Sequence, residues 1–365
     1  MFYKILHKFK ITHPVLSIFQ HLHRSPNLEQ ASTSGLECHN FYSCLCSSTG
    51  SLDKSYDLAI IIPAYNEEKN IKRCIDSVLN QKTTFNYQCI IVDDGSCDRT
   101  GQIIDTYVCD KRVTIKHQEN LGLSGARNTG IRISKAKYLM FLDSDDSLPQ
   151  NAVQLLMSCA FEQNAAIVEG AFNSTNTNGK VVTKHPHKAG KLNPREDFFG
   201  FACMKVFISE LFDGICFPEG YWYEDSIMAQ IIYPLAEARN YTCFGIADTI
   251  YNYTINPSGI TQAGRSNPKC IDSIWITLQL YKCRNALGLK TDQKYYEYIL
   301  SMIALSYRRT ELQPDDIKKS IFVLWREFIE TEFTGFLSSD SCKNILAQAV
   351  RDGNYRLYTL CCKLL

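Results

Sequence analysis

Short apolar runs alternate with amphipathic segments between about residues 56 and 142. Each run has the length of a strand rather than of a helix, and the runs are Leu58–Ile62, Cys89–Val92, Val113–Ile115 and Tyr138–Leu142. The segments between them carry apolar residues on one face and predict helices: one after Asn66, one from about Arg99 to Val108, and one from Ser124 to Lys135. Alternating helices and strands that are apolar on both faces predict a mostly parallel sheet with helices on both sides.

The pattern changes twice further along the chain. The next predicted elements are a helix over Ala152–Glu162, a strand over Ala165–Gly170, a hairpin at Val181–Thr183, a loop from His185 to Glu196, a helix over Phe198–Phe212, and a helix that opens at Glu224 and runs through Ile232. From about Pro268 the sequence predicts amphipathic helices to the end. We therefore expect an N-terminal extension or linker over residues 1–55, an α/β domain over residues 56–265 and a helical region over residues 266–365.

Composition narrows the class of protein. The 39 Lys and Arg residues balance 38 Asp and Glu residues, so the basic excess of a nucleic-acid-binding protein is absent. The 16 cysteines lie in apolar stretches without CxxC spacing, which favours buried thiols in the cytoplasm, with the inner face of a membrane as a variant. The sequence has no run of about 18 apolar residues. The segment Met1–Arg24 fits either a basic helix on a membrane or a helix packed on the main domain.

The strongest chemical signal is the acidic end of the fourth strand, Asp143-Ser144-Asp145-Asp146. Parallel sheets bind ligands at the carboxyl ends of their strands. Carboxylates there suggest Mg²⁺ or Mn²⁺ holding a phosphate. The alternative is an acidic turn in which Asp146 or Ser147 caps a helix starting near Pro149. Neither the dinucleotide-binding glycine motif nor the P-loop motif occurs in the chain.

Five motifs in order resemble the family 2 glycosyltransferases, which have the GT-A fold. They are Ile62-Pro63-Ala64-Tyr65-Asn66-Glu67, Val92-Asp93-Asp94-Gly95-Ser96, Gly125-Ala126-Arg127-Asn128, Phe141-Leu142-Asp143-Ser144-Asp145-Asp146, and Phe217-Pro218-Glu219-Gly220 followed by Tyr223-Glu224-Asp225. The resemblance covers about residues 56–263 and implies a Rossmann-like, mostly parallel sheet. The chain lacks both the Gln-x-x-Arg-Trp motif and the membrane spans of the processive members, which implies transfer of one sugar per encounter.

The resemblance also implies roles for individual residues. A nucleotide-sugar donor would be bound by Pro63, Ala64, Tyr65, Glu67, Asp94, Arg127 and Asp143. Asp145 would be the main ligand of Mn²⁺ or Mg²⁺, with Asp143 facing the metal or the ribose. Asp225 would be the catalytic base, next to Glu224. An Arg that many members place after a Tyr-x-Tyr run is replaced here by Thr254, and Arg265 is a candidate substitute.

The implied reaction is metal-dependent transfer with inversion of a sugar, by family habit from a UDP-sugar, to a hydroxyl of a glycan or lipid-linked acceptor in polysaccharide or glycoconjugate synthesis. Breaking the donor bond places charge on a diphosphate, and the acceptor hydroxyl needs a base. Two other functions remain open, a nucleotidyltransferase and a nucleotide-sugar-binding protein without turnover. Oligomerisation and contact of Tyr355–Leu365 with a membrane also remain open.

Each of these residues also has a purely structural interpretation. Asp93 and Asp94 could form a turn, Arg127 could be a surface charge, and Glu224 with Asp225 could interact only with a helix dipole. Trp222 and Tyr223 could stack on an acceptor sugar or belong to the core. His185 and His187 are expected in solvent on the loop.

Overall fold

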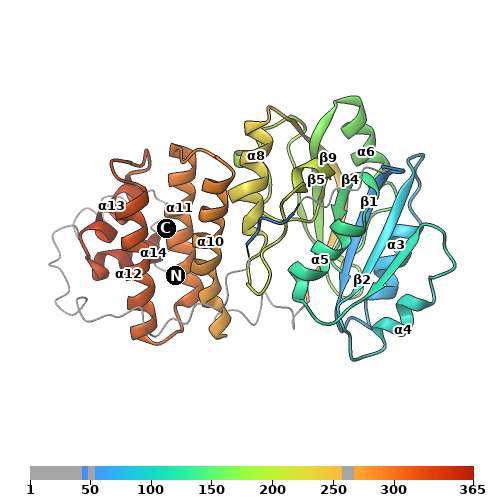
Figure 1. Cartoon of the computed structure of the whole chain (residues 1–365), viewed down its shortest axis with the longest axis horizontal. Coiled ribbons are helices and arrows are strands. Elements are labelled where there is room, and N and C mark those ends of the chain that lie inside the picture. Colours follow the sequence, from blue (N-terminus) through green and yellow to red (C-terminus); the bar gives the residue numbers. More distant parts are fainter. Residues whose placement is uncertain (1–42, 48–53, 257–266) are drawn as a thin grey trace. The chain divides into compact units, whose positions relative to one another are not determined.

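The computed structural model describes residues 43–47, 54–256 and 267–365 (Figure 1). The chain divides into two compact units, one drawn from residues 42–257 and 279–289 and the other, as far as it is described, from residues 267–278 and 290–365. Most of the predicted N-terminal extension, together with Arg265, lies outside the described residues. Among the helices of the described part, none is long and apolar enough to cross a bilayer.

One sheet organises the first unit. Its strands are β1 (Tyr56–Ala64), β2 (Tyr87–Asp93), β3 (Val113–His117), β4 (Ala136–Phe141), β5 (Ala165–Thr175), β6 (Val181–His185), β7 (Gly190–Lys191), β8 (Lys205–Ile208) and β9 (Thr242–Thr254). The order is β3-β2-β1-β4-β8-β5-β9-β7, with β6 paired to β5. β1 runs parallel to β2 and β4, and β2 runs parallel to β3. The predicted parallel sheet is confirmed in this half, whereas β8 is antiparallel to both its neighbours, β4 and β5.

Helices cover both faces of the sheet, as predicted. Alternate side chains of β1, including Ile60 and Ile62, pack with the apolar face of α3 (Ile71–Leu79). Ile61 points to the other face, where it meets α5 (Gly122–Ile133). A Cβ atom added at Gly130 would overlap the side chain of Ile61, so the backbone of α5 lies directly on the strand. This contact needs glycine because no other residue leaves room.

Short helices complete the first unit (Figure 1). They are α4 (Thr100–Asp105), α6 (Ala152–Glu162), α7 (Pro194–Asp197) and α8 (Tyr233–Ala238), and a π-helical turn over Met228–Ile232 leads into α8. α6 packs against β5 and β9, and its buried residues Leu156 and Met157 join the same core cluster as α3.

One predicted helix was wrong, and the predicted start of another was misplaced. Phe198–Phe212 is not a helix, since it contains β8 and a 3₁₀ turn over Ser209–Phe212. Pairing with β4 and β5 overrides the local helical pattern there. The helix expected to open at Glu224 and run through Ile232 is confirmed, since helical backbone begins at Ser226 and continues through the π-helical turn into α8. By contrast, α3 starts after Asn70, and Asn66 instead has a positive φ of 53°.

The second unit is helical, as the sequence predicts. Its elements are a 3₁₀ turn (Pro268–Ile271), the start of α10 (Asp272–Ala286), α11 (Gln293–Thr310), α12 (Asp315–Glu332), α13 (Ser341–Arg351) and α14 (Tyr355–Leu364). α14 packs on α11 and α13 and buries Leu357, Tyr358 and Cys361. Cys362 and Leu364 are buried as well, whereas Tyr355, Leu360 and Leu365 are partly exposed.

Candidate active site

The carboxyl ends of β1, β2 and β4 bring the sequence-predicted residues to one edge of the sheet. Ala64, the last residue of β1, pairs in register with Asp93 at the end of β2. On the other side of β1, Ile61 pairs with Phe141, two residues before Asp143. The first, second and fourth motifs therefore meet at neighbouring strand ends, as expected for a ligand site in a parallel sheet.

Asp94 is buried and held by hydrogen bonds to the end of β1 and to the loop after β3. Its N–H donates to the carbonyl of Ala64 at 2.9 Å. Its Oδ1 accepts from Gln118 Nε2 at 2.7 Å and from Leu121 N at 2.9 Å. Asp93 plays a different part, because its Oδ1 accepts from Ser96 N in the turn and its Oδ2 contacts a ring nitrogen of His117. Asp93 thus forms the turn that the structural interpretation predicted.

Tyr65 and Glu67 follow β1 at the same edge. The Tyr65 side chain is exposed, so its ring is open to a ligand. The backbone of Glu67 is anchored, since its N–H donates to Thr100 Oγ1 at 2.7 Å. The carboxylate of Glu67 faces the acids after β4, where its charge helps to raise the pKa of Asp145.

Arg127 connects two groups of acids that are far apart in the sequence. Its side chain is 2% exposed, and Nη2 lies 2.9 Å from Asp143 Oδ1. Nη1 lies 2.9 Å from Glu224 Oε1 and 3.3 Å from Asp225 Oδ1. The guanidinium also lies over the ring of Phe217, 5.2 Å from its centre. Although burial opposes its charge, the three carboxylates raise the pKa of Arg127 above its ordinary value.

The acids Glu224 and Asp225 reach Arg127 because their loop is tied to α5. Asn128, the next residue of α5, donates through Nδ2 to the carbonyl of Phe217 at 2.9 Å and accepts from Phe217 N at 2.7 Å. Tyr223, directly before the acids, has a positive φ of 68°. Such a backbone is unfavourable for a bulky residue, so the surrounding contacts must hold it in place.

Both acids have raised pKa values. Burial and the neighbouring carboxylate of Asp225 raise the pKa of Glu224 to about 7, against the effect of Arg127. Burial also raises the pKa of Asp225, which Arg127 opposes and Asp143 reinforces. The side chains of Asp143 and Asp225 remain 32% and 30% exposed, so both carboxylates stay open to a ligand. A carboxylate with a raised pKa is better suited to accept a proton.

The acids after β4 divide into two roles. Asp146 is fully buried, and it accepts hydrogen bonds from Tyr251 Oη at 2.7 Å and from Thr254 N at 2.6 Å. It therefore fastens β9 to the end of β4 rather than capping a helix. Burial and the charges of Asp143 and Glu67 raise the pKa of Asp145 to about 6.

Two carboxylates at this edge fit a divalent cation. In the part of the chain that the structure describes, no group of three or more His, Cys, Asp or Glu residues is arranged to hold a metal. Asp143 is nevertheless close enough to Asp145 for its negative charge to raise the pKa of Asp145, and a cation would relieve that repulsion. One or two carboxylates, completed by phosphate oxygens and water, form the usual donor set of Mg²⁺.

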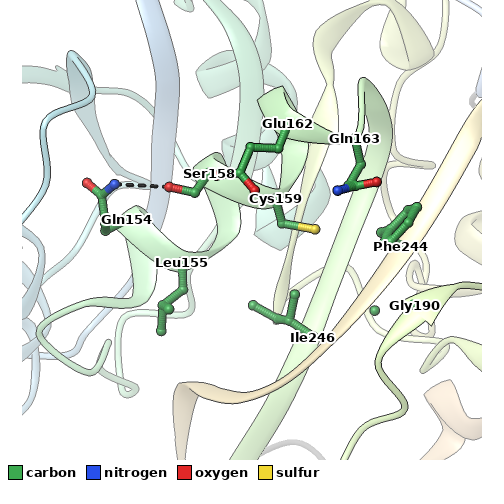
Figure 2. Close-up of a pocket in the computed structure, with 10 residues that line it drawn as sticks. Gln154, Leu155, Ser158, Cys159, Glu162, Gln163, Gly190, Phe244 and Ile246 are labelled. Atoms are coloured by element: carbon green, nitrogen blue, oxygen red, sulfur yellow. Dashed lines mark hydrogen bonds between the residues drawn. The ribbon is translucent and has the colours of Figure 1, made fainter.

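One hollow of this unit is lined by none of these acids. Figure 2 shows it beside α6 and β9, lined by Gln154, Leu155, Ser158, Cys159, Glu162, Gln163, Gly190, Phe244, Gly245 and Ile246. Gln154 Nε2 donates to Ser158 Oγ across its rim at 3.0 Å. The lining contains none of the sequence-predicted site residues, so the carboxylate edge remains the candidate site.

Sequence reasoning missed several residues that shape this edge. Asn128 stood in a motif but received no role, and Tyr251 was noted only within a Tyr-x-Tyr run. Ala202 N donates to Asp225 Oδ1 at 3.2 Å, and a backbone donor leaves no mark in a sequence. His187, expected in solvent, is 2% exposed and contacts Glu169, while His185 stacks on Phe172 with ring centres 4.1 Å apart.

Comparisons with known proteins agree with this geometry. The family model described as Glycosyl transferase family 2 matches residues 59–218. The chain is 30% identical over 215 residues to glycosyltransferase GlyG of Streptococcus pneumoniae, covering 54% of this chain and 70% of GlyG. It is 29% identical over 223 residues to glycosyltransferase GlyA of the same species, covering 56% of this chain but only 31% of GlyA.

A solved structure supports the fold. S. aureus TarS, residues 1–349 in complex with UDP-GlcNAc, superposes with a TM-score of 0.64 at 16% identity, covering 83% of this chain and 89% of that 1–349 chain. The fold is thus of the GT-A type. Together with the match to most of GlyG, these findings show that the chain belongs to glycosyltransferase family 2.

Proposed function

We propose that the protein transfers a single sugar from a nucleotide-sugar donor, a UDP-sugar, to a hydroxyl of a glycan or lipid-linked acceptor. The transfer inverts the anomeric centre and depends on Mn²⁺ or Mg²⁺. One observation carries the proposal, namely that Arg127 contacts Asp143 at the end of β4 and Asp225 on a distant loop with the same guanidinium. A donor-side acid and a candidate base therefore share one site.

The donor side would bind the nucleotide through groups at the ends of β1 and β2. Asp94 is held by Gln118 and Leu121 through Oδ1, which orients its carboxylate toward a ligand without loss of side-chain freedom on binding. The exposed ring of Tyr65 offers a surface on which a base can stack. The solved relative is a complex with UDP-GlcNAc, which supports a uridine nucleotide as the first donor to test.

The acceptor side would provide the base. Asp225 is oriented by Arg127 through one oxygen and by Ala202 N through the same oxygen, at 3.3 and 3.2 Å. In the proposed step the acceptor hydroxyl attacks the anomeric carbon, its proton passes to Asp225, and the bond to the nucleoside diphosphate breaks. One base opposite the leaving group gives a single displacement with inversion, by analogy with inverting glycosidases.

A divalent cation would be held by Asp145 and Asp143. When bound, it would supply positive charge beside the leaving diphosphate. Arg127 would remain in place to balance the charges of Glu224 and Asp225 while Asp143 turns toward the cation.

The test is transfer by the full chain from a panel of nucleotide sugars with Mn²⁺, with and without chelator. Asp225→Asn should keep donor binding and lose about 10²- to 10⁴-fold in turnover, the usual contribution of a general base. Asp248→Asn, an exposed acid on β9, is the matched control and should transfer normally. If the unaltered chain binds the donor without turnover, and Asp225→Asn leaves that binding unchanged, the result would instead indicate a nucleotide-sugar-binding protein. Turnover unaffected by Asp225→Asn, with a nucleotide joined to a sugar phosphate, would indicate a nucleotidyltransferase.

A further inference from the structure

A fully buried ion pair lies beside the candidate site and is not used by the proposed reaction. Lys205 on β8 and Glu169 on β5 face each other in register, with Nζ 2.5 Å from Oε1. Both side chains are 0% exposed. Burying two charges is unfavourable unless the geometry is good and further hydrogen bonds satisfy the remaining groups. The other bonds of the pair therefore indicate what it does.

All of those bonds except one, which joins Glu169 to His187, end on one irregular segment, residues 199–202. Lys205 Nζ donates to the carbonyls of Phe199 at 3.1 Å and Phe201 at 2.6 Å. Glu169 Oε2 accepts from Phe199 N at 2.9 Å and from His187 Nε2 at 2.7 Å. The three N–H donors of the ammonium group are thereby satisfied. The pair fixes a stretch of backbone that belongs to no helix or strand.

This segment ends at the candidate base. Ala202, one residue after the second carbonyl held by Lys205, donates its N–H to Asp225 Oδ1 at 3.2 Å. Met204, between Ala202 and Lys205, has a positive φ of 69°. A non-glycine residue holds such a conformation only where its surroundings enforce it, and such strain gathers at functional sites. The ion pair is the buried contact directly next to this strained residue.

We propose that Lys205 and Glu169 are positioning residues for Asp225, acting through the backbone of residues 199–202. The pair fixes the Ala202 N–H, and that N–H fixes the carboxylate in the orientation in which it receives the acceptor proton. This inference rests on the proposed function. It concerns turnover rather than donor binding, because no bond of the pair reaches the residues at the ends of β1 and β2.

The experiment replaces the whole pair, so that no unpaired charge is left in the core. Lys205→Met with Glu169→Leu is an apolar exchange of similar size, which proteins often tolerate. With the full chain and the active nucleotide sugar, kcat should fall at least tenfold while KM for the donor stays within twofold. A crystal structure of the variant should show the Ala202 N–H displaced from Asp225.

A matched control lies on the preceding loop. Lys188 and Asp197 form an ion pair at 2.5 Å with an exposed lysine, and no contact of that pair reaches Asp225. Lys188→Met with Asp197→Leu should leave both kcat and KM unchanged. If kcat fell as far in this control variant as in the variant of the buried pair, removing any nearby ion pair would have the same effect. That result would overturn the inference.

A folded double variant with the kcat of the unaltered chain overturns the inference, as does a parallel loss of kcat and donor affinity, since that indicates only a loosened fold. If the double variant does not fold, Glu169→Gln decides, because it keeps the shape and removes the charge. A folded Glu169→Gln variant with unchanged kcat is contrary to the inference. No turnover by the unaltered chain on any nucleotide sugar would count against the proposed function itself.

Discussion

The donor side and the acceptor side of the candidate site are built by different means. The donor side, residues 62–67, 93–96 and 118–121, consists of strand ends and turns closed mainly by backbone hydrogen bonds. The acceptor side, residues 199–205 and 217–225, is irregular backbone held by the buried charges of Arg127, Lys205 and Glu169. Substitutions should therefore affect ligand binding on the donor side but both stability and turnover on the acceptor side.

The largest effect is expected at Arg127, because its loss removes a buried charge on which the acceptor side depends. Arg127→Met leaves Asp143, Glu224 and Asp225 without their shared cation. Breaking a buried charge pair typically lowers the free energy of unfolding by about 3–5 kcal/mol. Denaturant unfolding measures it, and Arg99→Met is the control, since Arg99 is 74% exposed in its pair with Glu68 and should change stability by about 1 kcal/mol or less. Equal effects of the two substitutions would contradict the dependence of the acceptor side on buried charge.

Glu224 tests the same side through pH. Its pKa is about 7 in the folded protein and 4.5 as the ordinary value, so the folded state binds this proton more tightly. The stabilisation from this group is complete below pH 4.5 and is lost as pH rises through about 7. Glu224→Gln should therefore reduce the decline in unfolding free energy between those pH values by about 3 kcal/mol. The exposed Glu237→Gln variant should not change it, and an unaltered slope in Glu224→Gln would count against the raised pKa.

Asp94 tests whether substitutions on the donor side affect ligand binding. Asp94→Ala removes a charged acceptor, and hydrogen bonds to charged groups contribute about 1.5–3 kcal/mol. We expect UDP to bind at least about tenfold more weakly by calorimetry. Asp105→Ala, whose side chain is 64% exposed on α4, serves as control. Unchanged affinity in Asp94→Ala would remove this residue from the proposed donor pocket.

The smallest effect is expected at His117, at the end of β3. Asp93 raises its pKa against the effect of burial, and Asp105 adds to the rise. A raised histidine pKa stabilises the fold fully below pH 6.5, and the stabilisation is lost as pH rises through the higher folded value. Since the ring is 47% exposed, His117→Gln should cost less than about 1 kcal/mol at pH 5 and nothing at pH 9. Thermal unfolding at the two pH values measures this difference, and a larger loss at pH 9 would reverse the sign.

The sequence predicted the donor side better than the acceptor side for a physical reason. Strand, turn and acid lie next to one another in the chain there, so a local pattern reveals both the element and its side chain. The acids Glu224 and Asp225 were also recognised from their motif. Lys205 and Glu169 were not recognised, because they are paired only by the register of β8 and β5.

The same limit explains the errors in the fold. Phe198–Phe212 has a helix-like pattern, yet β8 forms because β4 and β5 offer free edges on either side of it. His187 was predicted to be a solvent-exposed loop residue, because no neighbouring residue in the sequence identifies Glu169 as its partner. In both cases a contact between residues distant in the sequence determines the structure, and a local sequence pattern does not contain that information.

The contact between Gly130 and Ile61 sets the spacing between α5 and β1 beside the candidate site. Gly130 stands one helical turn beyond Arg127, so the spacing between helix and strand determines how far the guanidinium extends over the acids. A single methyl group at position 130 would act as a wedge, tilting the helix and drawing the cation back from its partners. The position of the Arg127 guanidinium therefore depends on a glycine on the face of α5 that packs against β1.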